Sequence, residues 1–382
     1  MKKIIVIFIL LCICLNFIQA QVSFKSNGQQ FAEGIGREIA LGDFNNDKFL
    51  DAFIINQDGF VVYFGNGKGQ FNQSKQTFSS ELGWWGTPAT GDINHDGSLD
   101  IITGKIVWFN NGSGKFTSNY NFIDIGESER ISTVKLADLN GNGHLDLFLI
   151  INYNCNRILF NDGTGHFKNS GQKIGDGLIG SGQVADIALG DINNDGSVDA
   201  VTTGWRWDGS TECPNHIWIN DGKGNFSLSS QILDEGGSHI HNVKLFDLNN
   251  DGWLDLIMAI QDENRSGRIF LNDKSGKFIF KCDIESRSGE DVEFTDFNND
   301  GITDILVAQS SPPSRIWLND GKGNLTDSNI RLGENCYWDT AIGDFNNDSK
   351  PDIFAVGFKW ENRLNPAPPQ VWLNTTQYSF DE

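Results

Sequence analysis

One nine-residue pattern occurs seven times in this chain and constrains its fold more than any other feature. In the fourth copy it reads Asp191-Ile-Asn193-Asn-Asp195-Gly196-Ser-Val-Asp199, with oxygen-bearing side chains at positions 1, 3, 5 and 9 and a glycine at position 6. The copies follow one another at intervals of 46 to 56 residues. A nearly constant period of this length is typical of propellers, solenoids and other arrays. We therefore expect one array of similar units.

The spacing of these oxygens predicts calcium sites. Ca²⁺ takes about six to eight oxygen ligands, and a central glycine allows a sharp turn because it has no Cβ. The pattern is not an EF-hand, because its acid stands at position 9 and apolar, strand-like runs flank it. Asx turns without metal are the alternative, although three carboxylates in most copies favour a cation. The predicted ligands, at positions 1, 3, 5 and 9, are Asp43, Asn45, Asp47, Asp51, Asp92, Asn94, Asp96, Asp100, Asp138, Asn140, Asn142, Asp146, Asp191, Asn193, Asp195, Asp199, Asp247, Asn249, Asp251, Asp255, Asp296, Asn298, Asp300, Asp304, Asp344, Asn346, Asp348 and Asp352.

Three copies depart from the pattern. Position 6 is Lys48 in the first copy and Ser349 in the seventh, where Pro351 follows at position 8. A residue other than glycine there has to adopt a strained φ or change the turn. The third copy has Asn142 at position 5, which offers a neutral oxygen. We expect up to seven Ca²⁺ ions, with weaker first and seventh sites.

Each repeat has the same plan of four short strands. An apolar strand leads into the loop, a second follows it, a third ends in a sequence such as Trp218-Ile-Asn220-Asp-Gly, and a fourth begins with Gly-x-Phe. The Asn-Asp-Gly stretches join two strands, so they are hairpin turns rather than phosphate loops. Seven such units predict an all-β, seven-bladed β-propeller with four-stranded antiparallel blades. The seventh repeat lacks a fourth strand, and residues 22–31 are predicted to supply it and close the ring.

These features resemble the FG-GAP or VCBS repeat family, as in the N-terminal propeller of integrin α chains. The resemblance covers nearly the whole mature chain, through the D-x-N-x-D-G-x-x-D loop and the later W/F-x-N-D-G-x-G-x-F segment. It implies calcium in the loops between first and second strands, on one face of the disc. It also implies that ligands meet the opposite face or the grooves between blades.

The N-terminus is a separate segment. A basic start, an apolar run over residues 4–15 and small residues near Ala20 predict a secretory signal peptide over residues 1–20, with a membrane anchor as the alternative. Residues 21–382 would be a secreted propeller, and no other run reaches the length of a spanning helix. The formal charge of -21 argues against nucleic-acid partners, because phosphate binding needs a basic surface. We expect a monomer.

Four cysteines remain after cleavage of the signal peptide. In an oxidising compartment an even number favours disulfides, and neighbouring blades bring the loops of Cys155 and Cys213 together. Cys282 and Cys336 would form the second pair, with free thiols as the alternative. Glycosylation sequons occur at Asn72, Asn111, Asn225, Asn264, Asn324, Asn347 and Asn374.

Candidate ligand-binding residues lie at the face opposite the loops. Counting five and six residues back from each loop gives a polar, non-repeating ring at the channel entrance, where His239 and His241 with Glu290 and Asp291 could form a metal or acid–base cluster. This ring could be solvated strand ends, a binding site or an acid–base cluster. Tryptophans outside the strand pattern suit sugar stacking or protein anchoring, or simple loop packing. The candidate residues are Trp84, Trp85, Trp205, Trp207, His241, Glu290, Trp338 and Trp360.

The sequence therefore predicts a secreted, calcium-binding, non-catalytic recognition or adhesion module for an extracellular glycan or protein. The alternative is a carbohydrate-active lyase or hydrolase with its site at the channel mouth, since propellers host both kinds of function. A purely structural part of a larger extracellular complex is the third interpretation. No catalytic residue is assigned.

Overall fold

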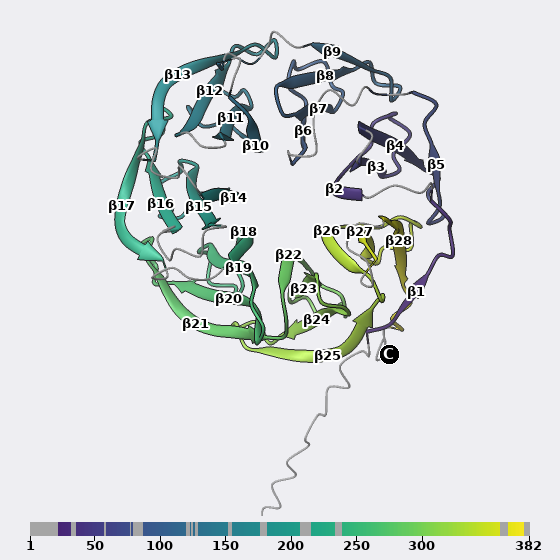
Figure 1. The fold of residues 1–382 in the computed structure, drawn as a ribbon. Helices are drawn as coiled ribbons and strands as arrows, with labels where there is room; N and C mark the ends of the chain where they lie inside the picture. Colours follow the sequence, from purple (N-terminus) through teal and green to yellow (C-terminus); the bar gives the residue numbers. More distant parts are fainter. Residues whose placement is uncertain are drawn as a thin grey trace, which may run out of the picture.

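The computed structural model describes residues 22–31, 36–56, 59–76, 78, 87–119, 123, 125–126, 129–151, 155–175, 182–206, 215–233, 239–359 and 366–377. These ranges form seven four-stranded antiparallel sheets around a central axis and contain no helix (Figure 1). The predicted seven-bladed β-propeller is thus confirmed. The segment predicted as a signal peptide lies outside the described residues.

Each blade runs from an inner strand at the axis to an outer strand at the rim. Blades 1 to 4 consist of β2 (Gly36–Gly42), β3 (Asp51–Asn56), β4 (Gly59–Gly65) and β5 (Phe71–Gln73); β6 (Ala89–Gly91), β7 (Asp100–Thr103), β8 (Ile106–Asn110) and β9 (Phe116–Asn119); β10 (Ile131–Ala137), β11 (Asp146–Ile151), β12 (Asn156–Asn161) and β13 (Phe167–Ile174); and β14 (Gly182–Gly190), β15 (Asp199–Arg206), β16 (Asn215–Asn220) and β17 (Phe226–Leu233).

The remaining three blades have the same strand order, except that the outer strand of blade 7 comes from the N-terminal part of the chain. They consist of β18 (His239–Phe246), β19 (Asp255–Gln261), β20 (Arg265–Asn272) and β21 (Phe278–Glu285); β22 (Gly289–Thr295), β23 (Asp304–Gln309), β24 (Ser314–Asn319) and β25 (Leu325–Leu332); and β26 (Cys336–Gly343), β27 (Asp352–Phe358), β28 (Pro366–Asn374) and β1 (Phe24–Ser26).

The N-terminal strand closes the ring as predicted. β1 pairs antiparallel with β28, with Phe24 opposite Asn374 and Ser26 opposite Trp372. Beyond β1, the ring of Phe31 packs between blades 7 and 1, with its centroid 5.2 Å from those of Tyr63 and Phe354. This closure covers the edge of β28, which would otherwise be open to pairing with another chain.

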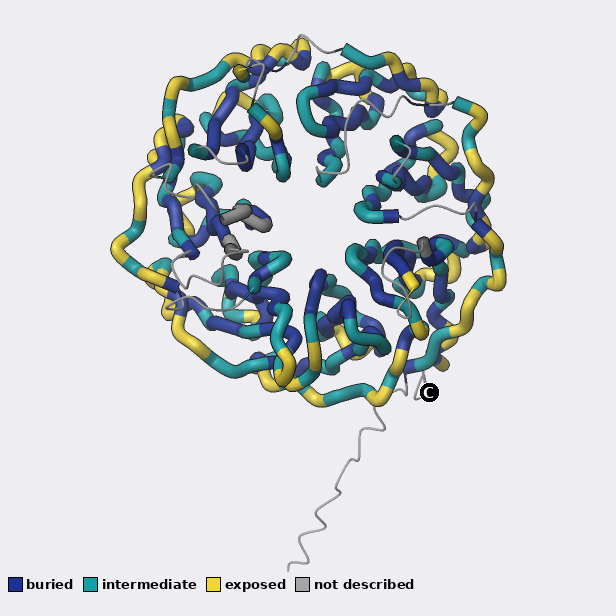
Figure 2. The backbone as a smooth tube through the Cα atoms, viewed as in Figure 1, coloured by how far each residue is buried: buried dark blue, intermediate teal, exposed yellow. Residues whose placement is uncertain are grey.

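The hydrophobic core lies between the blades. Seven apolar clusters each join residues of two neighbouring blades, as where Val134 and Leu149 of blade 3 meet Ile102 and Val107 of blade 2. The second strand of each blade packs on both faces, so its sequence is a continuous apolar run, all buried in β11 and β27. Figure 2 shows buried residues inside the blades and exposed residues on the outer strands. One third-strand position is a tryptophan in four blades, which predicts packing between blades; Trp108, Trp218 and Trp372 are buried there, and Trp317 is half-buried against the cluster of blades 5 and 6.

Candidate functional site

The seven Asp-Asn-Asp loops share one hydrogen-bond pattern. In the fourth loop the amides of Asp195 and Gly196 donate to the two carboxylate oxygens of Asp191, at 3.0 and 2.8 Å. The amide of Asp195 also donates to Oδ1 of Asn193, so the side-chain oxygens of positions 1 and 3 converge on one N–H group. The amides at positions 5 and 6 contact the first aspartate in all seven loops. The loops are thus preformed.

Two positions of each loop adopt the left-handed backbone conformation. Position 6 does so as predicted, and Lys48 and Ser349 adopt it at φ 73° and 62° with the same hydrogen bond to the first aspartate. The departures in loops 1 and 7 therefore keep the turn at some conformational expense rather than changing it. Position 4 is also left-handed, and it is Asn, His or Gly in every loop, as with Asn194 at φ 55° and His95 at φ 59°. The residue types at position 4 therefore indicate a second left-handed residue in each loop, which the sequence prediction did not include.

The ninth-position aspartates have a structural role that the ligand prediction did not include. Asp199 is fully buried, and its two oxygens accept from the amides of Ile192 in its own loop and Asn220 in the third strand, at 3.1 and 2.8 Å. Burial raises the pKa of Asp199 to about 6; these backbone hydrogen bonds lower it, and the nearby Asp195 and Asp191 raise it. The six equivalent aspartates are buried in the same way, with pKa values raised to about 6 or 7.

The donor set of these loops fits a hard cation. A carboxylate oxygen has two lone pairs, so one remains after each backbone hydrogen bond. In the fifth loop Oδ1 of Asn249 is buried and lacks a hydrogen-bond partner, as an unfilled ligand oxygen would. In the described part of the chain no three His, Cys, Asp or Glu side chains alone make a metal-binding group. Each loop would therefore also need its Asn amide oxygen, backbone carbonyls or water, which are ligands that Ca²⁺ accepts.

Six of the seven loops are tied to the next blade by the asparagine that ends its third strand. The side-chain amide of Asn220, which is 2% exposed, donates to the carbonyls of Leu139 in the preceding blade and Val198 in its own, at 2.8 and 2.9 Å. Its Oδ1 accepts from the amides of Gly222 and Gly224. Equivalent bonds join Asn110, Asn161, Asn272, Asn319 and Asn374 to the preceding loop. These hydrogen bonds link successive loops around the ring. Asn374 is 1% exposed, so its sequon is inaccessible in the folded chain.

At the other end of the inner strands, the pairing register shifts at the predicted channel entrance. The shift falls six residues before the loop in six inner strands, at or beside Arg37, Ser132, Asp186, His241, Glu290 and Trp338. A β-bulge bends the strand and re-aims side chains. The non-repeating residues of the predicted ring therefore lie at these register shifts in six blades, and the side chain at the mouth differs from one of these blades to the next.

Several residues five positions before the loops lock neighbouring blades together. Asp291 of blade 6 accepts from the amide and hydroxyl of Thr340 in blade 7, at 3.1 and 2.7 Å. Asp339 accepts from the amide of Ile39 in blade 1 at 2.7 Å, across the seam of the ring. Asp186 and Thr87 accept equivalent amides from the blades that follow them. This half of the predicted ring has a structural role.

The residues six positions before the loops form two pairs at the mouth. His241 Nδ1 lies 2.9 Å from Glu290 Oε2, and the side-chain amide of Gln261 donates to the other Glu290 oxygen. Burial lowers the pKa of His241, but the charge and hydrogen bond of Glu290 outweigh it and the net pKa is raised. The Arg37 guanidinium lies 4.5 Å from the centre of the Trp338 ring. The predicted proximity of His241 and Glu290 is therefore confirmed.

The mouth opens into an axial cavity of about 1310 Å³. On the inner strands, acidic side chains outnumber lysines and arginines along this cavity. The acidic residues are Glu38, Asp186, Glu290, Asp291, Glu293 and Asp339, and the basic ones are Arg37, Lys135 and Lys244. Burial raises the pKa of Glu38 to about 7, Arg37 opposes this, and Asp186 and Asp291 add to it. Lys135, Lys244 and Glu293 were not singled out from the sequence. Strand alternation could have found them, because they lie two residues beyond the predicted ring.

The predicted tryptophan platform has one described member. Trp338 stacks under Arg37, and its ring centroid lies 4.5 Å from that of Phe358, so this side chain is packed rather than free. Trp84, Trp85, Trp207 and Trp360, and the side chain of Trp205, lie outside the described residues.

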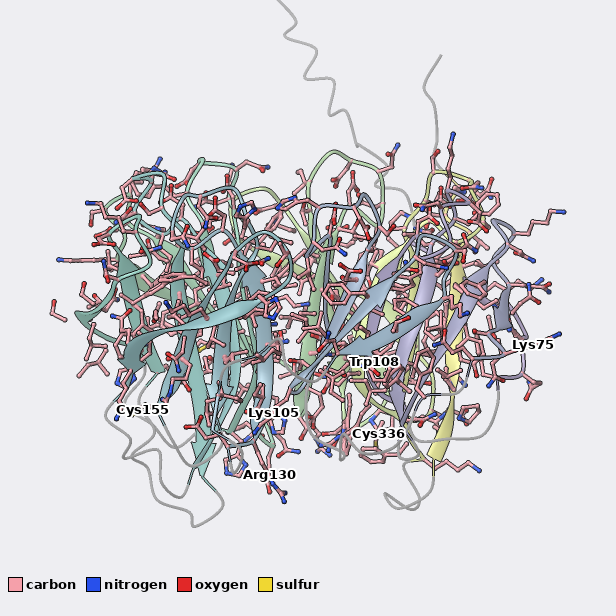
Figure 3. The ribbon with its side chains drawn as sticks, turned by 90° about the horizontal axis from the view of Figure 1, so that it is seen from above. Lys75, Lys105, Trp108, Arg130, Cys155 and Cys336 are labelled. Atoms are coloured by element: carbon pink, nitrogen blue, oxygen red, sulfur yellow. The ribbon has the colours of Figure 1, made fainter. Side chains whose placement is uncertain are left out.

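The predicted Cys282–Cys336 disulfide is wrong. Cys282 is a free thiol on the outer strand β21, whereas Cys336 begins the inner strand β26 and its thiol donates to the carbonyl of Ser310. One residue lies at the rim and the other near the axis, too far apart for the short Cα separation a disulfide requires. Figure 3 shows Cys155 and Cys336 toward one face of the disc, together with Lys105 and Arg130. Cys213, the predicted partner of Cys155, lies outside the described residues.

Comparison with known proteins agrees with this architecture. The FG-GAP-like repeat model matches residues 43–103, 138–202, 205–258 and 296–355, and these regions make up more than half of the chain. Among the described residues, no helix is long and apolar enough to cross a membrane.

Two curated relatives are T-cell immunomodulatory protein homologs. The Plasmodium falciparum (isolate 3D7) protein is 26% identical over 226 residues, which is 49% of this chain and 30% of that protein. The Plasmodium yoelii yoelii protein is 30% identical over 136 residues, which is 31% of this chain and 19% of that protein. The chain thus spans less than a third of the length of these relatives.

Solved structures share the fold at low sequence identity. An Agrocybe aegerita lectin that recognises non-reducing terminal N-acetylglucosamine has a TM-score of 0.54 and 22% identity, with 78% of this chain and 81% of that chain covered. BBS1N in complex with ARL6DN has a TM-score of 0.60 and 11% identity, with 93% and 97% covered. Together with the repeated loops and the seven blades, the family match shows that this chain belongs to the FG-GAP-like repeat family.

Proposed function

We propose that this chain is a secreted, calcium-dependent, non-catalytic recognition module that binds an extracellular glycan or protein at the channel mouth. The observation that carries the proposal is the difference between the two ends of the inner strands. One end carries seven loops with a single hydrogen-bond pattern, which suits a structural metal site. The other end carries a different side chain on each bulge, around a cavity large enough for a ligand.

Calcium would act as the structural element of this module. The first, third and fifth side chains of each loop would supply oxygens, and a bound cation would offset the repulsion between neighbouring carboxylates. Because Asn220 and its equivalents tie six of the loops to the blade that follows, an ordered loop also fixes the spacing between blades. The mouth would thus be presented on a rigid ring.

The test is a binding screen of the mature chain in calcium. A glycan array that includes N-acetylglucosamine-terminated glycans is the first probe, chosen because a lectin of the same fold recognises that sugar. Arg37→Ala and His241→Ala should weaken binding at least tenfold, whereas Lys322→Ala, in the exposed hairpin turn of blade 6, should leave it unchanged. A blank array would redirect the screen to extracellular proteins, and binding unaffected by both mouth variants would reject this site.

A carbohydrate-active enzyme is the second candidate, favoured by the His241–Glu290 pair at 2.9 Å. A histidine held by a carboxylate is suited to general acid–base chemistry. Both oxygens of Glu290 already have protein partners, so the glutamate would orient His241 rather than react itself. Incubation with polysaccharides tests this role: new reducing ends or an unsaturated product, lost in His241→Ala, would support an enzyme.

A further inference from the structure

Two histidines from neighbouring blades meet on the face that carries the aspartate loops. His95 occupies position 4 of the second loop, and His144 occupies position 7 of the third. Nε2 of His95 lies 2.7 Å from Nδ1 of His144, and the ring centroids are 4.8 Å apart at an interplanar angle of 58°. The rings are therefore not stacked, and one nitrogen of each points at the other.

The backbone fixes the position of both rings. His95 has φ 59°, the left-handed conformation that position 4 adopts in the other loops. His144 lies over Gly163 of its own hairpin turn, where an added Cβ would be 2.7 Å from the His144 ring. The serines at position 7 of loops 2 and 4 lie over the equivalent glycines, Gly112 and Gly222. The glycine thus leaves room for the larger imidazole ring.

The residue types at this junction differ from those at every other one. Position 4 is Asn or Gly in the other loops, and position 7 is never His in them. Where Asn stands at position 4, its amide donates to a backbone carbonyl of the next blade, as Asn46 does to Gly112 and Asn194 to Gly252. An asparagine would therefore be sufficient to link blades 2 and 3. Two imidazoles instead bring together two nitrogen donors.

We propose that His95 and His144 form a binding site for a borderline divalent transition metal such as Zn²⁺, Cu²⁺ or Ni²⁺ at the junction of blades 2 and 3. Imidazole suits these metals, whereas carboxylates and carbonyls suit Ca²⁺. No third His, Cys, Asp or Glu completes a group with this pair in the described ranges, so water or a donor from another molecule fills the remaining positions. Both histidines belong to aspartate loops, but the site would use their ring nitrogens and not the oxygens at positions 1, 3 and 5.

The geometry needs only a small adjustment. Zn–N bonds of about 2.0 to 2.1 Å in a tetrahedral site place two nitrogens roughly 3.3 Å apart, compared with 2.7 Å between the two here. His95 is exposed and His144 half-buried, so the rings can move apart. One of the two nitrogens now carries the bridging proton. On metal binding that proton moves to the other nitrogen of the same ring, and both facing nitrogens become ligands.

The experiment titrates the folded mature chain with ZnCl2 by calorimetry in excess CaCl2, which disfavours zinc at oxygen ligands. The variants are His95→Asn and His144→Ser, because other loops already carry those residues at these positions. The control is His166→Asn, an exposed histidine in the hairpin turn of blade 3. We expect one zinc site in the parent chain, at least tenfold weaker binding in each variant and no change in the control.

Two results would overturn the proposal. One is the absence of zinc binding by the parent chain, and the other is undiminished binding in a variant that combines His95→Asn with His144→Ser. Circular dichroism and the melting temperature in calcium check that each variant folds. If one variant is unfolded, the other still decides the question, because each removes one of the two donors.

Discussion

The side chain of Gln29 forms two hydrogen bonds with the backbone of Phe71: its amide donates to the Phe71 carbonyl at 2.5 Å and its Oε1 accepts from the Phe71 amide at 2.8 Å. Gln76, Gln172 and Gln231 make the same pair of bonds to the phenylalanine that begins the outer strand of the next blade. Gln29 therefore links blade 7 to blade 1 in the same way as the other three glutamines link consecutive blades. The residue just beyond β1 completes the ring with the device used between consecutive blades.

Loss of this contact at the seam should destabilise the ring more than loss at an internal junction. Gln29→Ala and Gln172→Ala each remove two hydrogen bonds, worth about 1 to 3 kcal/mol together. At the seam β1 pairs over only three residues, and no continuous chain joins it to β28. We expect the larger fall in melting temperature for Gln29→Ala. Equal shifts would mean that the seam is no weaker than other junctions.

Removal of calcium should destabilise the fold strongly. A ligand at a hundredfold excess over its Kd contributes about 2.7 kcal/mol per site, so several filled loops together predict a fall of more than about 10 °C in EDTA. Asp195→Ala should reduce the calcium stoichiometry by one, whereas Asp221→Ala, in the exposed hairpin turn of the same blade, should not. A melting curve that does not change in EDTA would reject the metal sites.

Asn220→Ala should be among the most destabilising polar substitutions in the chain. It removes four hydrogen bonds at a residue that is 2% exposed and leaves the carbonyl of Leu139 without this donor. We expect a loss of about 2 to 4 kcal/mol in the free energy of unfolding. Asn225→Ala is the matched control, because this side chain is exposed and its hydrogen bond is to Asp221, in its own hairpin turn. Its effect should stay within about 0.5 kcal/mol in urea unfolding.

Stability near neutral pH should depend on Glu38. Because burial raises its pKa from 4.5 to about 7, the folded chain holds this proton more tightly than the unfolded chain does. Stability is therefore lost as pH rises from about 4.5 through 7. Glu38→Gln should raise the melting temperature at pH 8 by about 2 °C and leave it nearly unchanged at pH 4.5. The same shift at both pH values would show that ionisation of Glu38 is not responsible.

Much of the fold is determined by the sequence alone because its signals are local. A nine-residue loop contains its own hydrogen bonds, as between Asp191 and Gly196, so its residue types are readable without the rest of the chain. The apolar run of β11 and the Asn-Asp-Gly turns likewise depend on near neighbours. With seven repeats, a closed ring of blades buries the second strand of every blade on both faces. Residues 22–31, which precede the first repeat, then complete the seventh blade.

The tertiary structure decided how residues from different blades are used. Asp291 and Asp339 appear in the sequence as members of a polar ring, but each accepts an amide from the following blade, which depends on the spacing between blades. The even number of cysteines predicts a disulfide between Cys282 and Cys336. In the folded chain, however, Cys282 lies at the rim and Cys336 near the axis. His95 and His144 are 49 residues apart, and only the packing of blade 2 against blade 3 brings their nitrogens together. Such contacts are set by the rotation from one blade to the next, which no local pattern in the sequence encodes.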